Sequence, residues 1–180
     1  IYLLGGYKFK ELEKYCKKNK KLNLIPIYSG INTNTGGRLL KLKNILKNKY
    51  FFLTYGDSLT NFNPKKSINY INKNPNHLVI SSYNYPINYG VLIKKKEYLN
   101  KILEKKHTVK INAGFYTLNS KIFKYIKFKN DSFEKDILPK LIRKNIKIKE
   151  IPITFWHPVD TISDKKSFEE LLKKNSKIVN

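Results

Sequence analysis

The sequence predicts an α/β fold in which a mostly parallel sheet carries helices on both faces. Short apolar runs typical of strands alternate along the chain with segments whose apolar residues recur at helical spacing. This alternation favours parallel strands joined by helical crossovers. The length of 180 residues allows one sizeable core, so we expect residues 1–180 to form a single domain.

The first half of the chain supplies four of the expected strands. Asn63 and Pro64 are good N-cap and first-turn residues for the helix that follows them. Pro26 predicts an edge position or a bulge for its strand. The expected strands are 1–4, 22–28, 50–55 and 77–83, the expected helices are 10–19, 38–48 and 64–74, and 29–37 is expected to be a loop.

The second half continues the alternation. Asp131 and Glu134 have the spacing of a capping box, Pro139 predicts a kink, and Ser163 is the expected cap of the last helix. The local pattern favours helices at 96–106, 120–126, 131–145 and 163–175, and a half-buried strand at 146–154.

The chain is strongly basic, with 37 Lys and Arg against 13 Asp and Glu and a formal net charge of +24. Only Arg38 and Arg143 are arginines, and the lysines are spread along the whole chain, as a compositional bias would leave them. Sequence-specific nucleic-acid binding is therefore disfavoured, because base readout relies on arginine forks. Weak, nonspecific attraction to polyanions is expected in any case.

The cysteine count and the lengths of the apolar runs indicate the cellular compartment. Cys16 is the single cysteine, which excludes an internal disulfide or a cysteine-based zinc site and fits a reducing, cytoplasmic compartment. The sequence has no apolar run long enough to span a membrane. Methionine is absent and Ile1 begins what reads as a strand, so we expect the natural start to lie upstream.

Two carboxylates follow apolar strands. Asp57 ends the run FFLTYGDS (51–58), and Asp160 lies in IPITFWHPVDTISD (151–164) after the single tryptophan, Trp156. Ligands of open α/β sheets bind beyond the carboxyl ends of the strands, and Mg²⁺ takes one or two protein carboxylates. We therefore expect Asp57 and Asp160 to converge on Mg²⁺.

Simpler interpretations remain open for the same segments. Asp57 is also good turn chemistry, Trp156 fits core packing, and His157 fits a solvated turn. His77 and His107 have no ligand spacing with His157, which disfavours a histidine–metal site.

Four ordered segments carry a family resemblance: TNTGGRLLKLKNIL, FFLTYGDSLTNFNPKKSINY, INAGFYTLNSKIFKYI and FWHPVDTISDKKSFEELL. Together they resemble the bacterial sugar-1-phosphate nucleotidyltransferases, within them the glucose-1-phosphate cytidylyltransferase branch. The resemblance implies the Rossmann-like fold of nucleotide-diphospho-sugar transferases. It also implies Mg²⁺-dependent transfer of a cytidylyl group from CTP to glucose 1-phosphate, giving CDP-glucose and pyrophosphate.

The resemblance also implies roles for matched positions. Asp57 and Asp160 match the metal-binding aspartates, and the other matches concern substrates. They are Thr33, Arg38 and Gly56 for the nucleotide, Glu104 for sugar hydroxyls, Lys105 for the sugar phosphate, and Asn112 and Gly114 for the sugar pocket. As alternatives, Lys105 fits a solvated charge and Arg38 a surface residue at a helix start.

The chain departs from the family pattern in several places. Lys106 replaces a proline and Ala113 a glycine, and nothing matches the family's G-G-x-G-T-R triphosphate loop or its K-P motif. We therefore expect this chain to lack the first strand, the loop and a connecting helix, and to show no turnover alone. The full-length protein is expected to be a homo-oligomer that does not engage a membrane.

Two rival interpretations stay open. One is a related pyrophosphorylase that uses UTP, dTTP or GTP, which nucleotide competition would identify. The other is a non-catalytic remnant with a basic, polyanion-binding surface, which DNA retention surviving Asp57→Asn and Asp160→Asn would favour.

Overall fold

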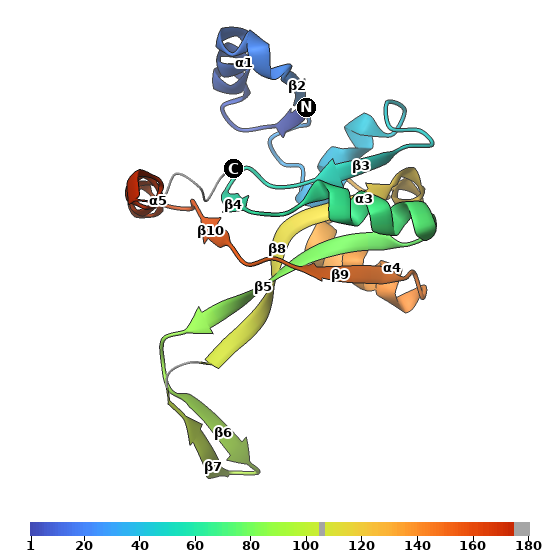
Figure 1. The fold of residues 1–180 in the computed structure, drawn as a ribbon. Coiled ribbons are helices and arrows are strands. Elements are labelled where there is room, and N and C mark those ends of the chain that lie inside the picture. Colours follow the sequence, from blue (N-terminus) through green and yellow to red (C-terminus); the bar gives the residue numbers. More distant parts are fainter. Residues whose placement is uncertain (105–106, 175–180) are drawn as a thin grey trace. The chain divides into compact units, whose positions relative to one another are not determined.

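The computed structural model describes residues 1–104 and 107–174 of the chain (Figure 1). The chain divides into two compact units: unit 1 is Ile1–Phe51 with Leu118–Lys147, and unit 2 is Phe52–Thr117 with the rest of the chain from Ile148. Each unit is described by itself. The expectation of one domain over residues 1–180 stays a prediction.

Unit 1 begins with a β-α-β motif. Strand β1 (Tyr2–Gly5) pairs in parallel with β2 (Ile25–Tyr28), and helix α1 (Phe9–Lys18) and the short 3₁₀ helix η1 (Lys20–Leu22) connect them. All three predicted elements are confirmed. Pro26 lies in a sheet of only two strands, where its missing N–H costs least.

The segment predicted as one helix over 38–48 is shorter and less regular. It consists of α2 (Thr35–Arg38) and the 3₁₀ helix η2 (Leu39–Leu42), followed by turns. Gly36 and Gly37 pack against the backbone of 129–133 so closely that a Cβ at Gly37 would lie 2.1 Å from the Lys129 carbonyl oxygen. This contact fixes the start of the segment, while the predicted apolar stripe is still buried through Leu39, Leu42 and Leu46.

Unit 1 ends with η3 (Ser120–Lys124), the π-helical turn η4 (Phe133–Ile137) and α4 (Leu138–Arg143). The helix predicted over 131–145 is shorter than expected, and its irregularity agrees with the predicted kink: the π-helical turn gives way to α4 just before Pro139, which has no N–H to donate to a preceding carbonyl. The predicted capping box is wrong. Ser132 caps the turn by accepting from the Lys135 N–H, and Glu134 instead accepts from the Thr35 hydroxyl.

A four-stranded sheet has the order β3-β8-β5-β9, and the boundary between the units falls within the chain segments of β3 (Tyr50–Leu53) and β8 (His107–Asn119). Strand β5 (Leu78–Ile87) runs antiparallel to β8 and parallel to β9 (Ile148–Pro152). The α/β class is confirmed, and the sheet is mixed, because β5 has one antiparallel and one parallel neighbour. The reason is local: β5 and β8 are joined through a β-hairpin, not through a helical crossover.

Strand β3 differs from its prediction in burial. Its residues alternate between exposed and half-buried, and it lies at the edge of the sheet. The apolar run FFL therefore does not form a fully buried strand. Phe51 stacks on Phe123 within unit 1, with ring centroids 6.1 Å apart.

Unit 2 contains further helices and strands besides the sheet. Helix α3 (Pro64–Lys73) is capped by Asn63 as predicted and contacts the sheet through the buried Ser67, which accepts a 2.8 Å hydrogen bond from Thr117. Strands β4 (Ser58–Thr60) and β10 (Trp156–Pro158) form a short antiparallel ribbon, and α5 (Ile162–Lys174) follows it. Within the described part of the chain, no helix is long and apolar enough to cross a membrane.

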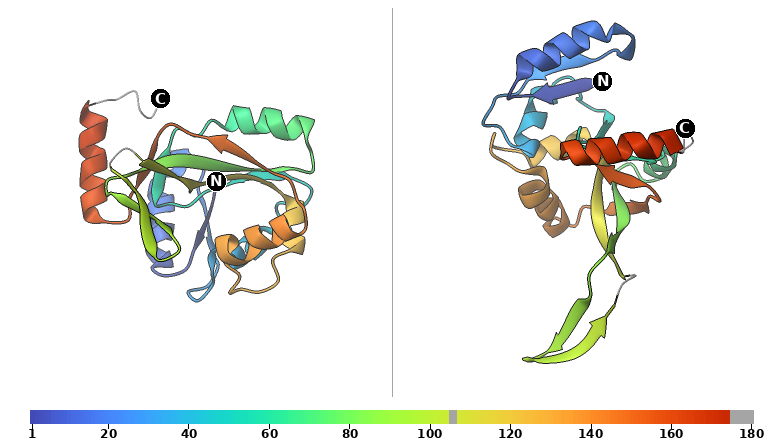
Figure 2. Two further views of the ribbon diagram at one scale, coloured as in Figure 1. Left: turned by 90° about the horizontal axis from the view of Figure 1, so that it is seen from below. Right: turned by 90° about the vertical axis from the view of Figure 1, so that its left-hand side faces the viewer.

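The hairpin that joins β5 to β8 consists of β6 (Val91–Lys95) and β7 (Tyr98–Leu103). Figure 1 and the right-hand view of Figure 2 show it extending from the ends of β5 and β8. The local prediction of a helix over 96–106 is therefore wrong for the residues described here. Two-residue turns such as Lys96–Glu97 allow the chain to reverse, and Lys96 adopts the positive φ of 56° that such turns require.

Candidate functional site

The β4–β10 ribbon brings the two predicted metal-binding aspartates together in unit 2. Pro158 pairs with Ser58, and one step further the Val159 N–H donates a 2.7 Å hydrogen bond to the carbonyl oxygen of Asp57. Asp160 is the next residue after Val159. Both aspartates are exposed, so their carboxylates are accessible to a ligand.

The sequence explains this arrangement. The turn with Asp57 comes directly before β4, Asp160 follows the end of β10, and the antiparallel pairing places the start of β4 beside the end of β10. Asn61 fastens the other end of the ribbon: its amide donates 2.7 Å to the Thr154 hydroxyl and its carbonyl accepts from the Phe155 N–H. The turn at Asp57 and the one at Asp160 thus lie at the same end of the β4–β10 ribbon. The two interpretations of Asp57, as turn residue and as ligand-facing carboxylate, are compatible.

Gly114 lies next to this ribbon because of a bulge in β8. Ile80 pairs with Tyr116 and Ser82 with Asn112, so the single residue Ser81 faces three residues of β8. The buried Ser81 hydroxyl accepts from the Phe115 N–H at 3.1 Å, and Gly114 has a φ of +77°. A Cβ on Gly114 would lie 3.4 Å from the Tyr55 ring and 3.7 Å from the Ser58 hydroxyl, the residue after Asp57.

Asn112 is tied into the same bulge. Its side-chain oxygen accepts from the Gly114 N–H at 3.0 Å, and its amide donates to the buried Tyr116 hydroxyl. Tyr116 in turn meets the Tyr55 ring edge to face, with centroids 6.3 Å apart. Asn112, Gly114, Gly56 and Asp57 are therefore linked by a short chain of contacts, with Tyr55 and Ser58 between them. Sequence reasoning did not single out Tyr55, Ser58 or Tyr116, although their clustering around Y-G-D and N-A-G-F was a usable signal.

A second group of polar side chains lies near Asn112 and consists of Ser82, Lys110 and Glu150. Ser82, opposite Asn112, donates 2.6 Å to Glu150, and Lys110 donates 2.8 Å to the same carboxylate. The hydrogen bond from Lys110, followed by that from Ser82, lowers the pKa of Glu150 below its usual range. Sequence reasoning missed this group as well.

Trp156 combines two features. It packs against Tyr83 and Tyr85, with ring centroids 6.1 and 5.9 Å away, which agrees with a packing role. Its indole N–H is nonetheless buried without a hydrogen-bond partner among the residues that the structure describes. His157, by contrast, is no solvated turn residue. It lies half-buried in β10, against the Phe168 ring of α5.

Glu104 and Lys105 were predicted to contact the sugar and its phosphate. The Glu104 carboxylate lies at the foot of the β6–β7 hairpin, 3.2 Å from where a Cβ on Gly90 would be. None of the contacts found for the described residues links it to Asp57 or Gly114, and its role stays a prediction. Lys105 lies outside the described residues.

The two nucleotide contacts predicted in unit 1 are close to each other. Arg38 is half-buried, and its guanidinium donates to the Ser29 hydroxyl and, at 3.1 Å, to the Gly30 carbonyl. Gly30 has a φ of +98°, and a Cβ there would lie 2.7 Å from the Thr33 hydroxyl. Arg38 thus holds the loop that leads to Thr33. This half-buried, hydrogen-bonded position argues against the interpretation of Arg38 as a surface residue at a helix start.

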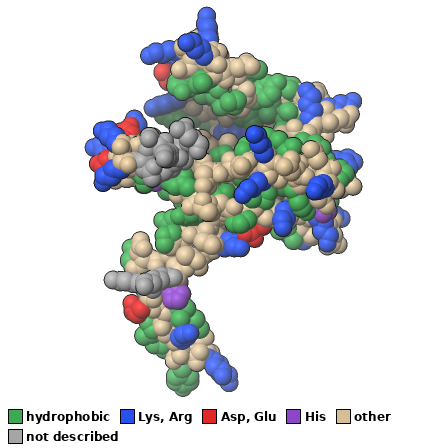
Figure 3. Space-filling view, viewed as in Figure 1, with side chains coloured by type: hydrophobic (Ala, Val, Ile, Leu, Met, Phe, Trp, Pro, Cys, Tyr) green, Lys and Arg blue, Asp and Glu red, His purple; other side chains and the backbone are tan. Residues whose placement is uncertain are grey.

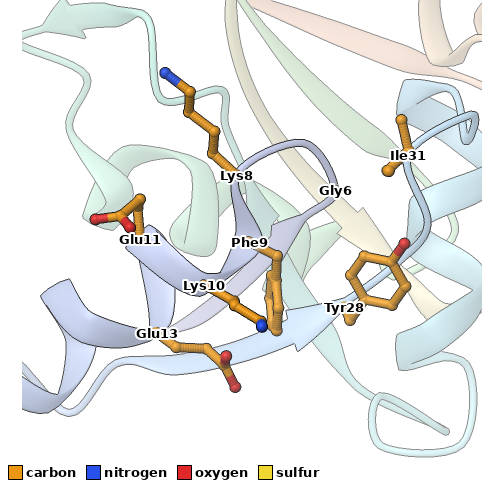
Figure 4. A pocket seen from close by; sticks show the side chains of 8 residues that line it. All are labelled: Gly6, Lys8, Phe9, Lys10, Glu11, Glu13, Tyr28 and Ile31. Carbon is orange, nitrogen blue, oxygen red and sulfur yellow. The ribbon is translucent and has the colours of Figure 1, made fainter.

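Unit 1 also has an open hollow of about 810 Å³, shown in Figure 4. Lysine and glutamate side chains alternate around it, and the rings of Phe9 and Tyr28 form its apolar part. It is lined by Gly6, Lys8, Phe9, Lys10, Glu11, Glu13, Tyr28 and Ile31. None of the predicted site residues lines this hollow, and its charges of both signs select no ligand class.

The donor set around Asp57 suits a hard cation. Among the described residues, no group of three or more His, Cys, Asp and Glu side chains gathers in a metal-binding arrangement. Two carboxylates satisfy Mg²⁺, which fills its other positions with phosphate and water. Asp57 and Asp160 are therefore a suitable pair of protein ligands for Mg²⁺.

Comparison with known proteins shows that the chain is similar to nucleotidyltransferases. A probable glucose-1-phosphate cytidylyltransferase of Bacillus subtilis is 30% identical over 135 residues, which are 74% of this chain and 53% of that protein. The glucose-1-phosphate cytidylyltransferase of Salmonella typhimurium is 26% identical over 166 residues, 91% of this chain and 65% of that protein. No family profile matches the chain.

The structural comparison agrees. The crystal structure of HddC from Yersinia pseudotuberculosis superposes with a TM-score of 0.68 and 26% identity, covering 95% of this chain and 78% of that one. The chain spans between about half and two thirds of the length of the two curated relatives above. Sequence and fold together confirm the predicted resemblance: the chain is homologous to the sugar-1-phosphate nucleotidyltransferases.

Proposed function

We propose that this chain serves the transfer of a cytidylyl group from CTP to glucose 1-phosphate, which yields CDP-glucose and pyrophosphate. The observation that carries the proposal is the hydrogen bond from the Val159 N–H to the Asp57 carbonyl oxygen, which holds the backbones of Asp57 and Asp160 near each other at one end of the β4–β10 ribbon. The curated relatives described above support the choice of CTP and glucose 1-phosphate.

Asp57 and Asp160 would hold Mg²⁺. When bound, the ion would offset charge on the phosphates of both substrates and orient them. The two carboxylates start from exposed turns whose backbones are fixed by the ribbon, so little reorganisation is needed for them to act together.

The neighbouring residues would position the sugar. The bulge of β8 places Gly114 beside Tyr55 and Ser58. Because glycine has no side chain, a sugar ring could approach the backbone there. Asn112 is held by Gly114 and Tyr116, and its fixed amide suits recognition of a hydroxyl group. Lys105 would offset the charge of the sugar phosphate.

The family resemblance assigns Thr33 and Arg38 to nucleotide binding. The hydrogen bonds of Arg38 to Ser29 and Gly30 hold the loop on which Thr33 lies. Gly56, beside Asp57, would leave room for the nucleotide.

The reaction needs no protein nucleophile. An oxygen of the sugar phosphate attacks the α-phosphorus of CTP in line, a new P–O bond forms, and the bond to pyrophosphate breaks. The work of the protein is to align the two reactants and to offset their negative charge.

Binding of the product tests the proposal on this chain. Calorimetry with CDP-glucose should show binding that requires Mg²⁺, and Asp57→Asn and Asp160→Asn should each weaken it about tenfold or more, as loss of a ligand carboxylate does. Glu170→Gln is the matched control, because it removes one negative charge from an exposed position on α5. UDP-, dTDP- and GDP-glucose, titrated in parallel, would reveal a preference for another base.

One result would contradict the proposal. Binding of CDP-glucose that is independent of Mg²⁺ and of both aspartates would remove their metal role. Turnover of CTP and glucose 1-phosphate by residues 1–180 would instead support the proposed reaction and overturn the expectation that this chain shows no turnover alone.

A further inference from the structure

Within the described part of unit 2, the indole N–H of Trp156 is a buried donor that lacks an acceptor. The large majority of buried side-chain polar atoms in proteins have a hydrogen-bond partner, and a buried donor without one costs free energy. The Thr60 hydroxyl, across the ribbon from Trp156, is directed to the Phe62 N–H instead, at 2.8 Å. An acceptor for the indole therefore remains to be identified.

The groups around the indole are aromatic rings. The Tyr83 ring lies 6.1 Å from it between centroids, and the Tyr85 ring lies 5.9 Å from it and meets it edge to face. We call Tyr83, Tyr85 and Trp156 the aromatic group. Tyr83 and Trp156 are half-buried, whereas Tyr85 is 45% exposed, so the aromatic group borders on solvent. Figure 3 shows hydrophobic side chains at the surface in the region of β10 and along β5 and β8.

The β4–β10 ribbon places Trp156 on the same face as the candidate sugar site. Trp156 pairs with Thr60 and Pro158 with Ser58, and residues directly opposite each other share a face. The Ser58 hydroxyl lies 3.7 Å from where a Cβ on Gly114 would be, so this face is directed at the bulge of β8. The packing of Trp156 on two tyrosines of β5 agrees with this orientation.

The spacing along the ribbon suits one sugar ring. Ser58 and Thr60 are two residues apart, which is about 6.6 Å along a strand. A hexose bound against the Gly114 backbone beside Ser58 is long enough to reach the residue opposite Thr60, which is Trp156. Ligand sites combine aromatic walls with a few polar groups that fix orientation, and the aromatic group supplies both.

We propose that the indole N–H of Trp156 donates a hydrogen bond to one hydroxyl of the hexose, while the rings of the aromatic group pack against the apolar edge of the sugar. This inference rests on the proposed function and adds to it a residue that determines sugar specificity. A hexose that lacks this hydroxyl leaves the donor unpaired and is bound less tightly.

The proposal requires one ring to move, because the N–H is buried. Tyr85 is the most exposed of the three rings, and exposed side chains change rotamer within nanoseconds. In the proposal the Tyr85 ring turns aside and the sugar takes its place against the indole.

The single tryptophan makes a direct test possible, because a ¹⁵N-labelled chain gives one indole N–H signal in a proton–nitrogen NMR spectrum. The chain is titrated with CDP-glucose and Mg²⁺ and, in parallel, with CDP and Mg²⁺, and calorimetry gives the saturation. CDP-glucose should move the indole proton signal downfield, as a new hydrogen bond does, and CDP should leave it in place. A signal that stays in place at saturation with CDP-glucose, or moves equally with CDP, overturns the inference while the proposed function stands.

Substitution gives a second readout. Trp156→Phe removes the N–H and keeps an aromatic ring, so it should weaken binding of CDP-glucose about fivefold, as loss of one neutral hydrogen bond does, and leave CDP binding unchanged. Tyr70→Phe is the matched control, because it removes the polar group of another aromatic side chain of unit 2, one that bonds His77. It should bind both nucleotides like the unchanged chain. Equal weakening of CDP and CDP-glucose in Trp156→Phe would leave Trp156 a packing role only and overturn the inference.

Analogues of CDP-glucose that each lack a different hydroxyl of the sugar identify the acceptor. One analogue should bind the unchanged chain about fivefold less tightly than CDP-glucose and lose no further affinity in Trp156→Phe, because the two changes remove the same hydrogen bond. If Trp156→Phe weakens every analogue by the same factor as CDP-glucose, no hydroxyl pairs with the indole and the inference fails.

Failure of the proposed function would look different. A chain that binds no CDP-glucose by calorimetry contradicts the proposed function and removes this inference with it, whereas every outcome above is read from a chain that binds CDP-glucose. Circular dichroism of each variant checks that the chain is still folded.

Discussion

Gly114 and Gly56 both belong to the candidate site, and only Gly114 needs to be glycine for conformational reasons. Gly114 has a φ of +77° and close neighbours in Tyr55 and Ser58, whereas a Cβ on Gly56 would meet nothing within 4 Å. An L-residue in the left-handed region costs roughly 1–2 kcal/mol. We therefore expect Gly114→Ala to lower the free energy of unfolding by about that amount, measured by urea denaturation.

Gly56→Ala is the control for this prediction. It should change the free energy of unfolding by less than about 0.5 kcal/mol, as surface substitutions usually do. Equal losses in the two variants would show that the positive φ of Gly114 has no energetic consequence.

Asp131 links stability to pH in unit 1. Burial raises the pKa of its carboxyl, but hydrogen bonds from the Phe128 and Lys127 N–H groups and the charge of Lys140 outweigh burial and lower the pKa overall. A carboxylate with a lowered pKa stabilises the fold above the ordinary Asp value of about 3.9 and loses this effect as the pH falls through its folded pKa.

Asp131→Ala should therefore lower the free energy of unfolding by about 1 kcal/mol at neutral pH, since the carboxylate is partly solvated. The difference from the unchanged chain should shrink as the pH falls below about 4. Denaturation midpoints across this range measure it, and Glu170→Gln serves as a control without such hydrogen bonds. A loss that is constant with pH would contradict the assigned cause.

At the scale of single residues, the sequence predicted a neighbourhood that the structure contains, and the roles within it stay predictions. Y-G-D and W-H-P-V-D-T singled out Asp57 and Asp160, and the ribbon brings their backbones together. The proximity of Tyr55, Ser58 and Tyr116 to the two motifs was a usable signal, but their contacts with Gly114 and Asn112 depend on the bulge in β8. A bulge depends on how two strands separated by more than 30 residues pair, as Ile80 and Tyr116 do.

Among the elements, the start of α5 allows a sharp test. The sequence favoured Ser163 as its cap, but Thr161 holds this position. The Thr161 hydroxyl accepts from the Asp164 N–H at 3.1 Å, and the Asp164 carboxylate accepts from the Thr161 N–H at 2.8 Å. This reciprocal pair is a capping box shifted two residues toward the N-terminus.

Thr161→Ala should therefore destabilise α5 by about 1 kcal/mol, the usual cost of losing a cap. Ser163→Ala should have little effect, because α5 already includes Ser163. Amide hydrogen exchange in α5 measures the difference. Faster exchange in Ser163→Ala than in Thr161→Ala would restore the original assignment of the cap.

The elements that sequence reasoning predicted correctly are those with their own signals. Helices α1 and α3 and strands β1, β2, β5 and β9 have caps or clear periodicity within a few residues. The elements that were wrong depend on contacts distant in sequence. The helix expected over 38–48 is replaced by shorter helical turns, because Gly36 and Gly37 pack on 129–133. In place of the helix expected over 96–106, the chain forms β7, which pairs with β6.

For the molecule as a whole, charge is the dominant property. The net charge of +24 is carried by lysines spread along the whole sequence. Such a distribution binds polyanions through counterion release, which weakens steeply as salt rises and reads no sequence. Retention on immobilised DNA should therefore be strong at low salt and fall by about a hundredfold or more by 200 mM salt.

This property should be separable from the proposed activity. Asp57→Asn and Asp160→Asn remove negative charge, so DNA retention should persist or rise slightly while Mg²⁺-dependent binding of CDP-glucose is lost. An excess of CDP-glucose should not release the DNA from the unchanged chain, because the lysines that hold DNA lie mostly outside the site. If CDP-glucose with Mg²⁺ displaces DNA completely, or if retention shows sequence preference, the basic surface is itself a specific site and the compositional explanation of the charge fails.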